Sequence, residues 1–116
     1  IATTLVRRHQ WTPKTPEVAR YWTTDYSALA IHEMMNLLMW IRNISLNAIQ
    51  IPLLVFYTEQ DDVVSVKVMK SRLSTYGGLV ELVERPGAPH VLAGQWMHPE
   101  GTAPVVSISQ EFLQRL

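Results

Sequence analysis

The stretch IPLLVFY, residues 51–57, is an unbroken apolar run, and it leads into a polar loop with two adjacent acids, Asp61 and Asp62. A continuous apolar run of this length is typical of a β-strand that is covered on both faces, as in parallel sheets. Pro52 fits the first position of such a strand. We therefore predict a buried strand with an acid just beyond its carboxyl end.

The order of elements after this run is strand, helix, strand, helix. Residues 65–76 carry apolar side chains at helical spacing and stop at a Gly-Gly pair, a common helix end. LVELVE, residues 79–84, predicts a second strand, and a last helix is expected to start near Pro104 with Thr102 as its cap. This βαβα order predicts an α/β fold with two parallel strands joined by a right-handed crossover.

The first part of the chain has a different character. Residues 1–24 mix prolines, threonines and arginines without a period, so we expect a loop with one short helical turn. A helix capped by Asp25 or Ser27 should follow, and its apolar residues spread beyond one stripe, which predicts burial on more than one side. These apolar residues include Ile31, Met34, Met35, Leu38 and Ile41. We divide the chain into a helical segment, residues 1–44, and a βαβα segment, residues 45–116.

Composition narrows the classes of partner. The 116 residues suffice for one small domain, and 10 Lys and Arg balance 10 Asp and Glu, so nothing points to a nucleic-acid partner. The absence of cysteine excludes disulfides and thiolate metal sites. The most apolar window, residues 28–41, is shorter than the ~20 residues of a membrane span, so no transmembrane segment is expected. Because the chain begins at Ile1 rather than Met, we expect it to be a piece of a longer protein.

An acid and a histidine follow the two predicted strands. Asp61 and Asp62 come after the first strand and His90 after the second. Neighbouring parallel strands lie ~4.8 Å apart and end at the same edge of the sheet, where α/β proteins bind ligands. If Asp61 accepts a hydrogen bond from one ring nitrogen of His90, the other nitrogen can take a proton from a nucleophile. The alternative is that the acids only cap a turn and the histidine is an ordinary surface residue.

Metal and cofactor motifs are not found in the sequence. HEMMN, residues 32–36, begins like a zinc-protease motif, but Asn36 stands where the second histidine must be. His90 and His98 have no recognised metal-ligand spacing with the two aspartates. The Gly-Gly pair lacks the further glycine of a phosphate-binding loop. We therefore expect no metal and no cofactor.

Two segments of this chain resemble enzymes of the α/β-hydrolase fold. IPLLVFYTEQDDVVSVKVMKSRL is similar to the segment of that family in which a strand delivers the catalytic acid. LVELVERPGAPHVLAG resembles the next segment, in which a short strand leads through a Pro-Gly turn to the catalytic histidine. The resemblance covers residues 45–116 and implies that Asp61 is the acid and His90 the general base, with Asp62 as the alternative acid. Residues 1–44 resemble, more loosely, the helical cap or lid that many of these enzymes carry.

The nucleophile of the family is missing from this chain. In α/β-hydrolases the serine lies earlier in the sequence, within Gly-x-Ser-x-Gly. No serine here has glycines two residues to either side; the serines are Ser27, Ser45, Ser65, Ser71, Ser74, Ser107 and Ser109. The resemblance therefore implies the carboxyl-terminal part of a serine esterase or lysophospholipase-like enzyme, acting on a small ester or lipid-like substrate.

Two interpretations remain open for the chain as it stands. Two parallel strands alone leave apolar edges, so we expect either a missing amino-terminal half or self-association to cover them.

The alternative function is a catalytically inert binding or interaction module on the same scaffold, because a fold does not determine an activity. The sequence does not indicate the compartment.

Overall fold

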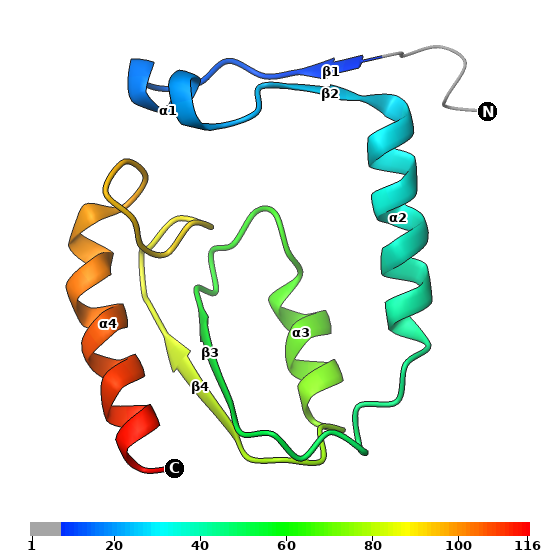
Figure 1. Ribbon diagram of the computed structural model, residues 1–116, viewed down its shortest axis with the longest axis vertical. Coiled ribbons are helices and arrows are strands. Elements are labelled where there is room, and N and C mark those ends of the chain that lie inside the picture. Colours follow the sequence, from blue (N-terminus) through cyan, green and yellow to red (C-terminus); the bar gives the residue numbers. More distant parts are fainter. Residues whose placement is uncertain (1–7) are drawn as a thin grey trace. The chain divides into compact units, whose positions relative to one another are not determined.

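The computed structural model describes residues 8–116 (Figure 1). It separates into two compact units, Ile1–Ile44 and Ser45–Leu116, which divide where the sequence analysis divides the chain. Helices and short strands alternate, so the predicted mixed α/β character is confirmed. Among the described helices, none has the length and apolar character needed to cross a membrane.

A short antiparallel hairpin forms the start of the first unit. Strands β1 (Arg8–Gln10) and β2 (Asp25–Ser27) pair with Gln10 opposite Asp25, and α1 (Pro16–Tyr21) lies between them in sequence. The Arg8 guanidinium donates from Nε to both carboxylate oxygens of Asp25 at 2.8 Å. The short helical turn is predictable from sequence but the hairpin is not, because the three-residue strands RHQ and DYS have no apolar alternation to reveal them.

The long helix α2 (Ala28–Arg42) is capped by Ser27, whose Oγ accepts from the Ala30 amide at 3.0 Å. Asp25, the other predicted cap, lies in β2 instead. The prediction that α2 is buried on more than one side is wrong: none of its residues is buried, and Trp40 is 65% exposed. In the described part of the first unit, residues 8–44, the small hairpin and the six-residue α1 are too small to cover a helix of 15 residues.

The second unit contains the predicted parallel strand pair, but the prediction that its first strand is buried is wrong, because every residue of that strand is only half-buried. Strands β3 (Leu53–Tyr57) and β4 (Val80–Glu84) pair in parallel, and α3 (Val66–Leu73) connects them. Their register runs from Leu53 opposite Val80 to Tyr57 opposite Glu84, so both strands end together. Ser65 caps α3 by accepting from the Val68 amide. The loops that follow the two strands therefore leave from one edge (Figure 1).

The prediction that the Gly-Gly pair ends the helix is wrong: α3 ends at Leu73 with Ser74 as its C-cap, and neither Gly77 nor Gly78 has a positive φ. A Cβ added at Gly77 would lie 1.9 Å from the carbonyl oxygen of Asn47, and one at Gly78 would lie 2.8 Å from that of Gln50. The two glycines therefore let the connector before β3 approach the chain closely.

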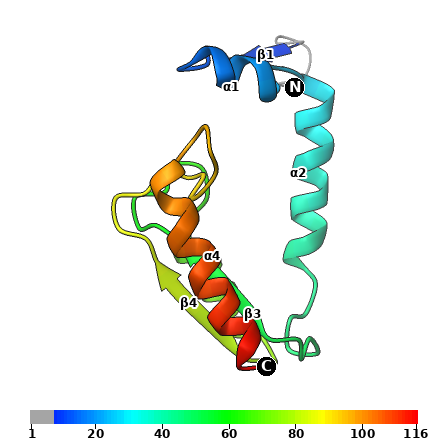
Figure 2. The same ribbon diagram turned by 60° about the vertical axis from the view of Figure 1, so that its left-hand side comes forward.

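The last helix, α4 (Pro99–Gln114), starts five residues before the predicted Pro104. Pro99 occupies the first turn, where the missing N–H of proline costs nothing, and Pro104 lies inside the helix. Thr102 is not a cap: its hydroxyl accepts from the Gly94 amide at 2.9 Å and fastens the preceding loop. The helix packs next to β3 (Figure 2).

The buried core of the second unit is small. Its buried residues are Thr58, Val66, Ala88, Gly101 and Phe112. Two of the five, Thr58 and Ala88, lie in the loops that follow the strands, so the core extends under the candidate site.

Candidate active site

The loop after β3 fixes the orientation of the Asp61 carboxylate. Its Oδ1 accepts hydrogen bonds from the backbone amides of Val63 and Val64, at 2.8 and 2.9 Å. The side chain is 7% exposed, and the Asp61 amide donates to the Thr58 carbonyl at 3.2 Å. With one oxygen held by the backbone, the other, Oδ2, is left to face a different partner.

That partner is His90, 29 residues further along the chain. Its Nδ1 lies 2.8 Å from Asp61 Oδ2, and 41% of its side chain is exposed. The structure thus brings together the two residues that the sequence places at the ends of neighbouring strands. Asp62, the alternative acid, is exposed, and it is Asp61 that contacts the ring.

The protonation of the pair follows from the environment of the acid. The hydrogen bond from His90 lowers the pKa of Asp61, the amides of Val64 and Val63 lower it further, and burial opposes them. Asp61 is therefore a carboxylate at neutral pH and can only accept a hydrogen bond. The Nδ1 of His90 must then carry the proton, and in the neutral ring Nε2 is left as the acceptor.

A glutamine links the two loops that carry this pair. Gln60 Oε1 accepts from the Thr58 hydroxyl at 2.9 Å and from the Gly87 amide at 3.3 Å. Thr58 is fully buried and directly follows β3, whereas Gly87 lies in the turn after β4. Neither Gln60 nor Thr58 was predicted as part of the site. The one sequence feature that points to the link is the pair Pro86-Gly87. In a tight turn with these two residues at its centre, the Gly87 amide has no partner inside the turn.

The acid loop is also fastened to α3. Lys70 of α3 forms an ion pair with Glu59 and lies over the Tyr57 ring, with Nζ 4.5 Å from its centroid. The contacts with Glu59 and then Tyr57 raise the pKa of Lys70. Through Lys70, the loop that carries Asp61 is therefore attached to α3 as well as to β3.

A second histidine in this unit also lies against a carboxylate. His98 precedes α4, and its Nδ1 lies 3.0 Å from Oε1 of Glu100 in the first turn of that helix. The Glu100 side chain is 71% exposed. This pair is local in sequence, and its acid is open to solvent, whereas the His98 side chain is 16% exposed.

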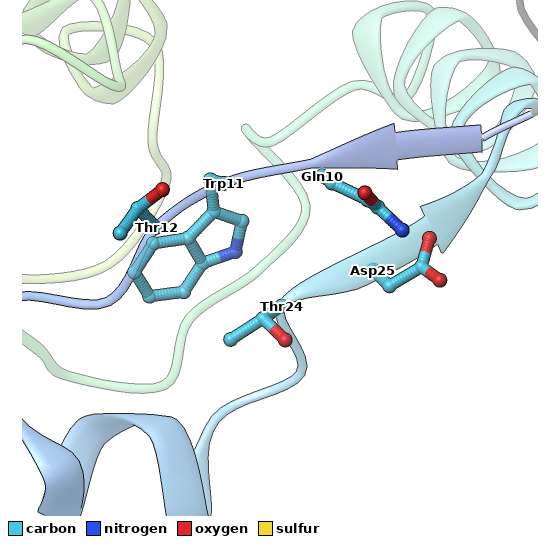
Figure 3. Close-up of a pocket in the computed structure, with 5 residues that line it drawn as sticks. All are labelled: Gln10, Trp11, Thr12, Thr24 and Asp25. Atoms are coloured by element: carbon cyan, nitrogen blue, oxygen red, sulfur yellow. The ribbon is translucent and has the colours of Figure 1, made fainter.

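Other arrangements that could bind a ligand are sparse. Within residues 8–116, no group of three or more His, Asp or Glu side chains is placed to hold a metal ion. The first unit has a hollow of about 250 Å³ beside the hairpin (Figure 3). Its lining residues are Gln10, Trp11, Thr12, Thr24 and Asp25. The acid of this hollow is already paired with Arg8, so the hollow offers no free charge.

The Asp61–His90 pair is therefore the arrangement in the described residues that fits proton transfer best. No family model, no curated protein and no solved structure matches this chain.

Proposed function

We propose that this chain supplies the acid and the base of a Ser-His-Asp triad in a serine hydrolase of the α/β-hydrolase type. The observation that supports this is the 2.8 Å contact between Asp61 Oδ2 and His90 Nδ1. The contact lies beyond the carboxyl ends of two adjacent parallel strands and leaves Nε2 unprotonated in the neutral ring. The resemblance of residues 45–116 to that family agrees with the positions of both side chains.

The proposed mechanism uses the two nitrogens of the ring in different ways. As a serine oxygen from outside this chain attacks the substrate carbonyl, Nε2 of His90 accepts the hydroxyl proton. The ring becomes an imidazolium, and the Asp61 carboxylate stabilises its charge through Nδ1. The same Nε2 then donates its proton to the leaving group, and a water molecule activated in the same way releases the acyl group.

The substrate class follows from the resemblance to esterases and lysophospholipases. We propose a small ester or a lipid-like ester as the substrate. Hydrolysis of p-nitrophenyl esters of increasing acyl length by the whole protein would define the preference.

The test begins with the coding sequence that precedes Ile1. The proposal expects a Gly-x-Ser-x-Gly segment there, and ester hydrolysis by the protein expressed from its own start codon. Asp61→Asn and His90→Ala should abolish most of this activity, and Asp62→Asn, the matched control, should leave it intact. Near-normal turnover in Asp61→Asn or His90→Ala would refute the assignment, and damage confined to Asp62→Asn would move the acid by one residue.

The second candidate is a catalytically inert binding module on a hydrolase-like scaffold. It is favoured by one observation: no serine of this chain lies in the required glycine context. A fluorophosphonate probe, which labels activated serines covalently, distinguishes the two. Labelling of the whole protein that is lost in His90→Ala supports the enzyme, and no labelling of the whole protein supports the binding module.

A further inference from the structure

We propose that Gln60 is a positioning residue that locks the histidine loop to the acid loop and so maintains the Asp61–His90 hydrogen bond. The inference deepens the proposed function and rests on it for its catalytic consequence. Gln60 directly precedes Asp61 in sequence, and its contact Gly87 lies three residues before His90. A link between these two points fixes the separation of the acid and the ring.

One oxygen atom makes the link. Gln60 Oε1 accepts from the Thr58 hydroxyl at 2.9 Å and from the Gly87 amide at 3.3 Å. A backbone amide can only donate, so the atom that faces Gly87 must be the side-chain oxygen rather than the nitrogen. The orientation of the Gln60 amide is therefore fixed by its partners. Because Thr58 is fully buried, the glutamine is held on the side of the acid loop by a rigid neighbour.

The turn after β4 provides the other end of the link. Ala88 N donates to Arg85 O at 3.1 Å, which closes a turn with Pro86 and Gly87 at its centre. Gly87 has a φ of +74°, a conformation that glycine adopts without strain. Its N–H is not used by the closing hydrogen bond of the turn, and it is this group that Gln60 engages.

The link matters because the ring itself is only partly enclosed. His90 is 41% exposed, whereas the Asp61 side chain is 7% exposed and held by two backbone amides. The acid is thus held by its own loop, whereas the ring is more exposed and depends on the position of the histidine loop. If the histidine loop is released, water can replace the carboxylate at Nδ1, and the ring then populates both neutral tautomers.

The experiment uses two variants of matched size in the whole protein. Gln60→Met keeps the length of the side chain but removes the acceptor oxygen, and Gln60→Glu keeps an acceptor oxygen. Two measurements are made by NMR: the hydrogen-exchange rate of the Gly87 amide and the protonation of the two His90 ring nitrogens. Gln60 is exposed, so both variants should fold, and protection of the Arg85 amide, which donates to Tyr57 O, reports an intact strand pair.

The expected result is specific to the acceptor oxygen. In Gln60→Met, the Gly87 amide should exchange about tenfold faster, as expected on loss of one hydrogen bond of ordinary strength. The His90 ring should change from one tautomer to a mixture. Gln60→Glu should retain slow exchange and the single tautomer. Unchanged exchange and tautomer in Gln60→Met, or equal effects of both variants, would overturn the proposal.

A kinetic measurement separates this inference from the proposed function. In the whole protein, Gln60→Met should lower kcat by about tenfold to a hundredfold with little change in KM, as misplacement of a catalytic group by about 1 Å does. If the wild-type whole protein hydrolyses no ester, the proposed function fails, while the NMR result still decides whether Gln60 positions His90. If the wild type is active and Gln60→Met retains full kcat, the positioning role fails and the proposed function stands.

Discussion

His90 and His98 each lie close to a carboxylate oxygen, at 2.8 Å from Asp61 and 3.0 Å from Glu100. The two acids differ in how they are held. The Asp61 side chain is 7% exposed, and its other oxygen, Oδ1, accepts hydrogen bonds from two backbone amides. The Glu100 side chain is 71% exposed and lies only two residues from its partner. An exposed carboxylate such as that of Glu100 loses side-chain entropy when it forms the contact. This loss offsets most of the electrostatic attraction, so the contact adds little stability. The orientation of a histidine ring therefore depends on how firmly its acid is held, and not only on the short distance between them.

The largest expected difference between the two pairs is in activity. In the whole protein, Asp61→Asn should lower kcat/KM for ester hydrolysis by about 10⁴, because the asparagine amide favours the wrong tautomer of the ring. Glu100→Gln should have no measurable effect, because Glu100 lies on the surface and its histidine has no proposed role. Initial rates with a p-nitrophenyl ester measure both. Equal losses in the two variants would contradict the distinction drawn between the pairs.

The proximity of Asp61 and His90 is predictable from sequence because two features of the chain determine their positions. The apolar run and LVELVE predict parallel strands, and parallel strands that are joined by a helix end at one edge, which brings Asp61 near His90. The choice between Asp61 and Asp62 was not determined, because adjacent residues have the same spacing to every other element. The structure favours Asp61 through the Val63 and Val64 amides, and which amides face a carboxylate cannot be read from residue types.

The parts of the fold that were missed have physical reasons as well. The hairpin strands of the first unit are three residues long and carry no apolar pattern. Pro104 predicts the start of α4 because proline favours a first turn, but Pro99 satisfies the same preference earlier in the chain. The prediction that α2 is buried is wrong because the sequence shows only which side chains of a helix are apolar. It does not show whether another element is present to cover them. The Gln60 link had no signal in residue spacing.

The second prediction concerns stability. Asp61→Ala removes the acceptor of two backbone amides and of the His90 ring, so the free energy of unfolding should fall by about 1–3 kcal/mol. Glu100→Ala should change it by no more than about 0.5 kcal/mol, as is usual at exposed sites. Urea denaturation of the whole protein and its variants provides both values. A loss in Glu100→Ala as large as that in Asp61→Ala would show that the two acids are held equally.

The pH dependence of stability sharpens the same contrast. The pKa of Asp61 is lowered in the folded chain, so its stabilising contribution is present above the unfolded value of about 3.9. It is lost as the pH falls through the folded pKa. The difference in unfolding free energy between wild type and Asp61→Asn should therefore be largest near neutral pH and should shrink below about pH 4. A difference that stays constant from pH 7 to pH 3 would contradict an ionised, hydrogen-bonded Asp61.

The smallest expected effect is that of the neighbouring acid. Asp62 is exposed, so Asp62→Asn should change the free energy of unfolding by no more than about 0.5 kcal/mol. The NMR signals of the His90 ring should be unchanged in this variant. A shift of those signals as large as in Asp61→Asn would mean that Asp62, rather than Asp61, orients the ring.

The central claim is that a fixed carboxylate determines which nitrogen of His90 carries the proton. Long-range ¹H–¹⁵N correlation spectra of the whole protein, recorded at a pH where the ring is neutral, report the protonation of each nitrogen directly. The account predicts that Nδ1 is protonated and Nε2 is not, and that Asp61→Asn reverses this assignment. A wild-type ring protonated at Nε2, or a variant ring identical to the wild type, would contradict it.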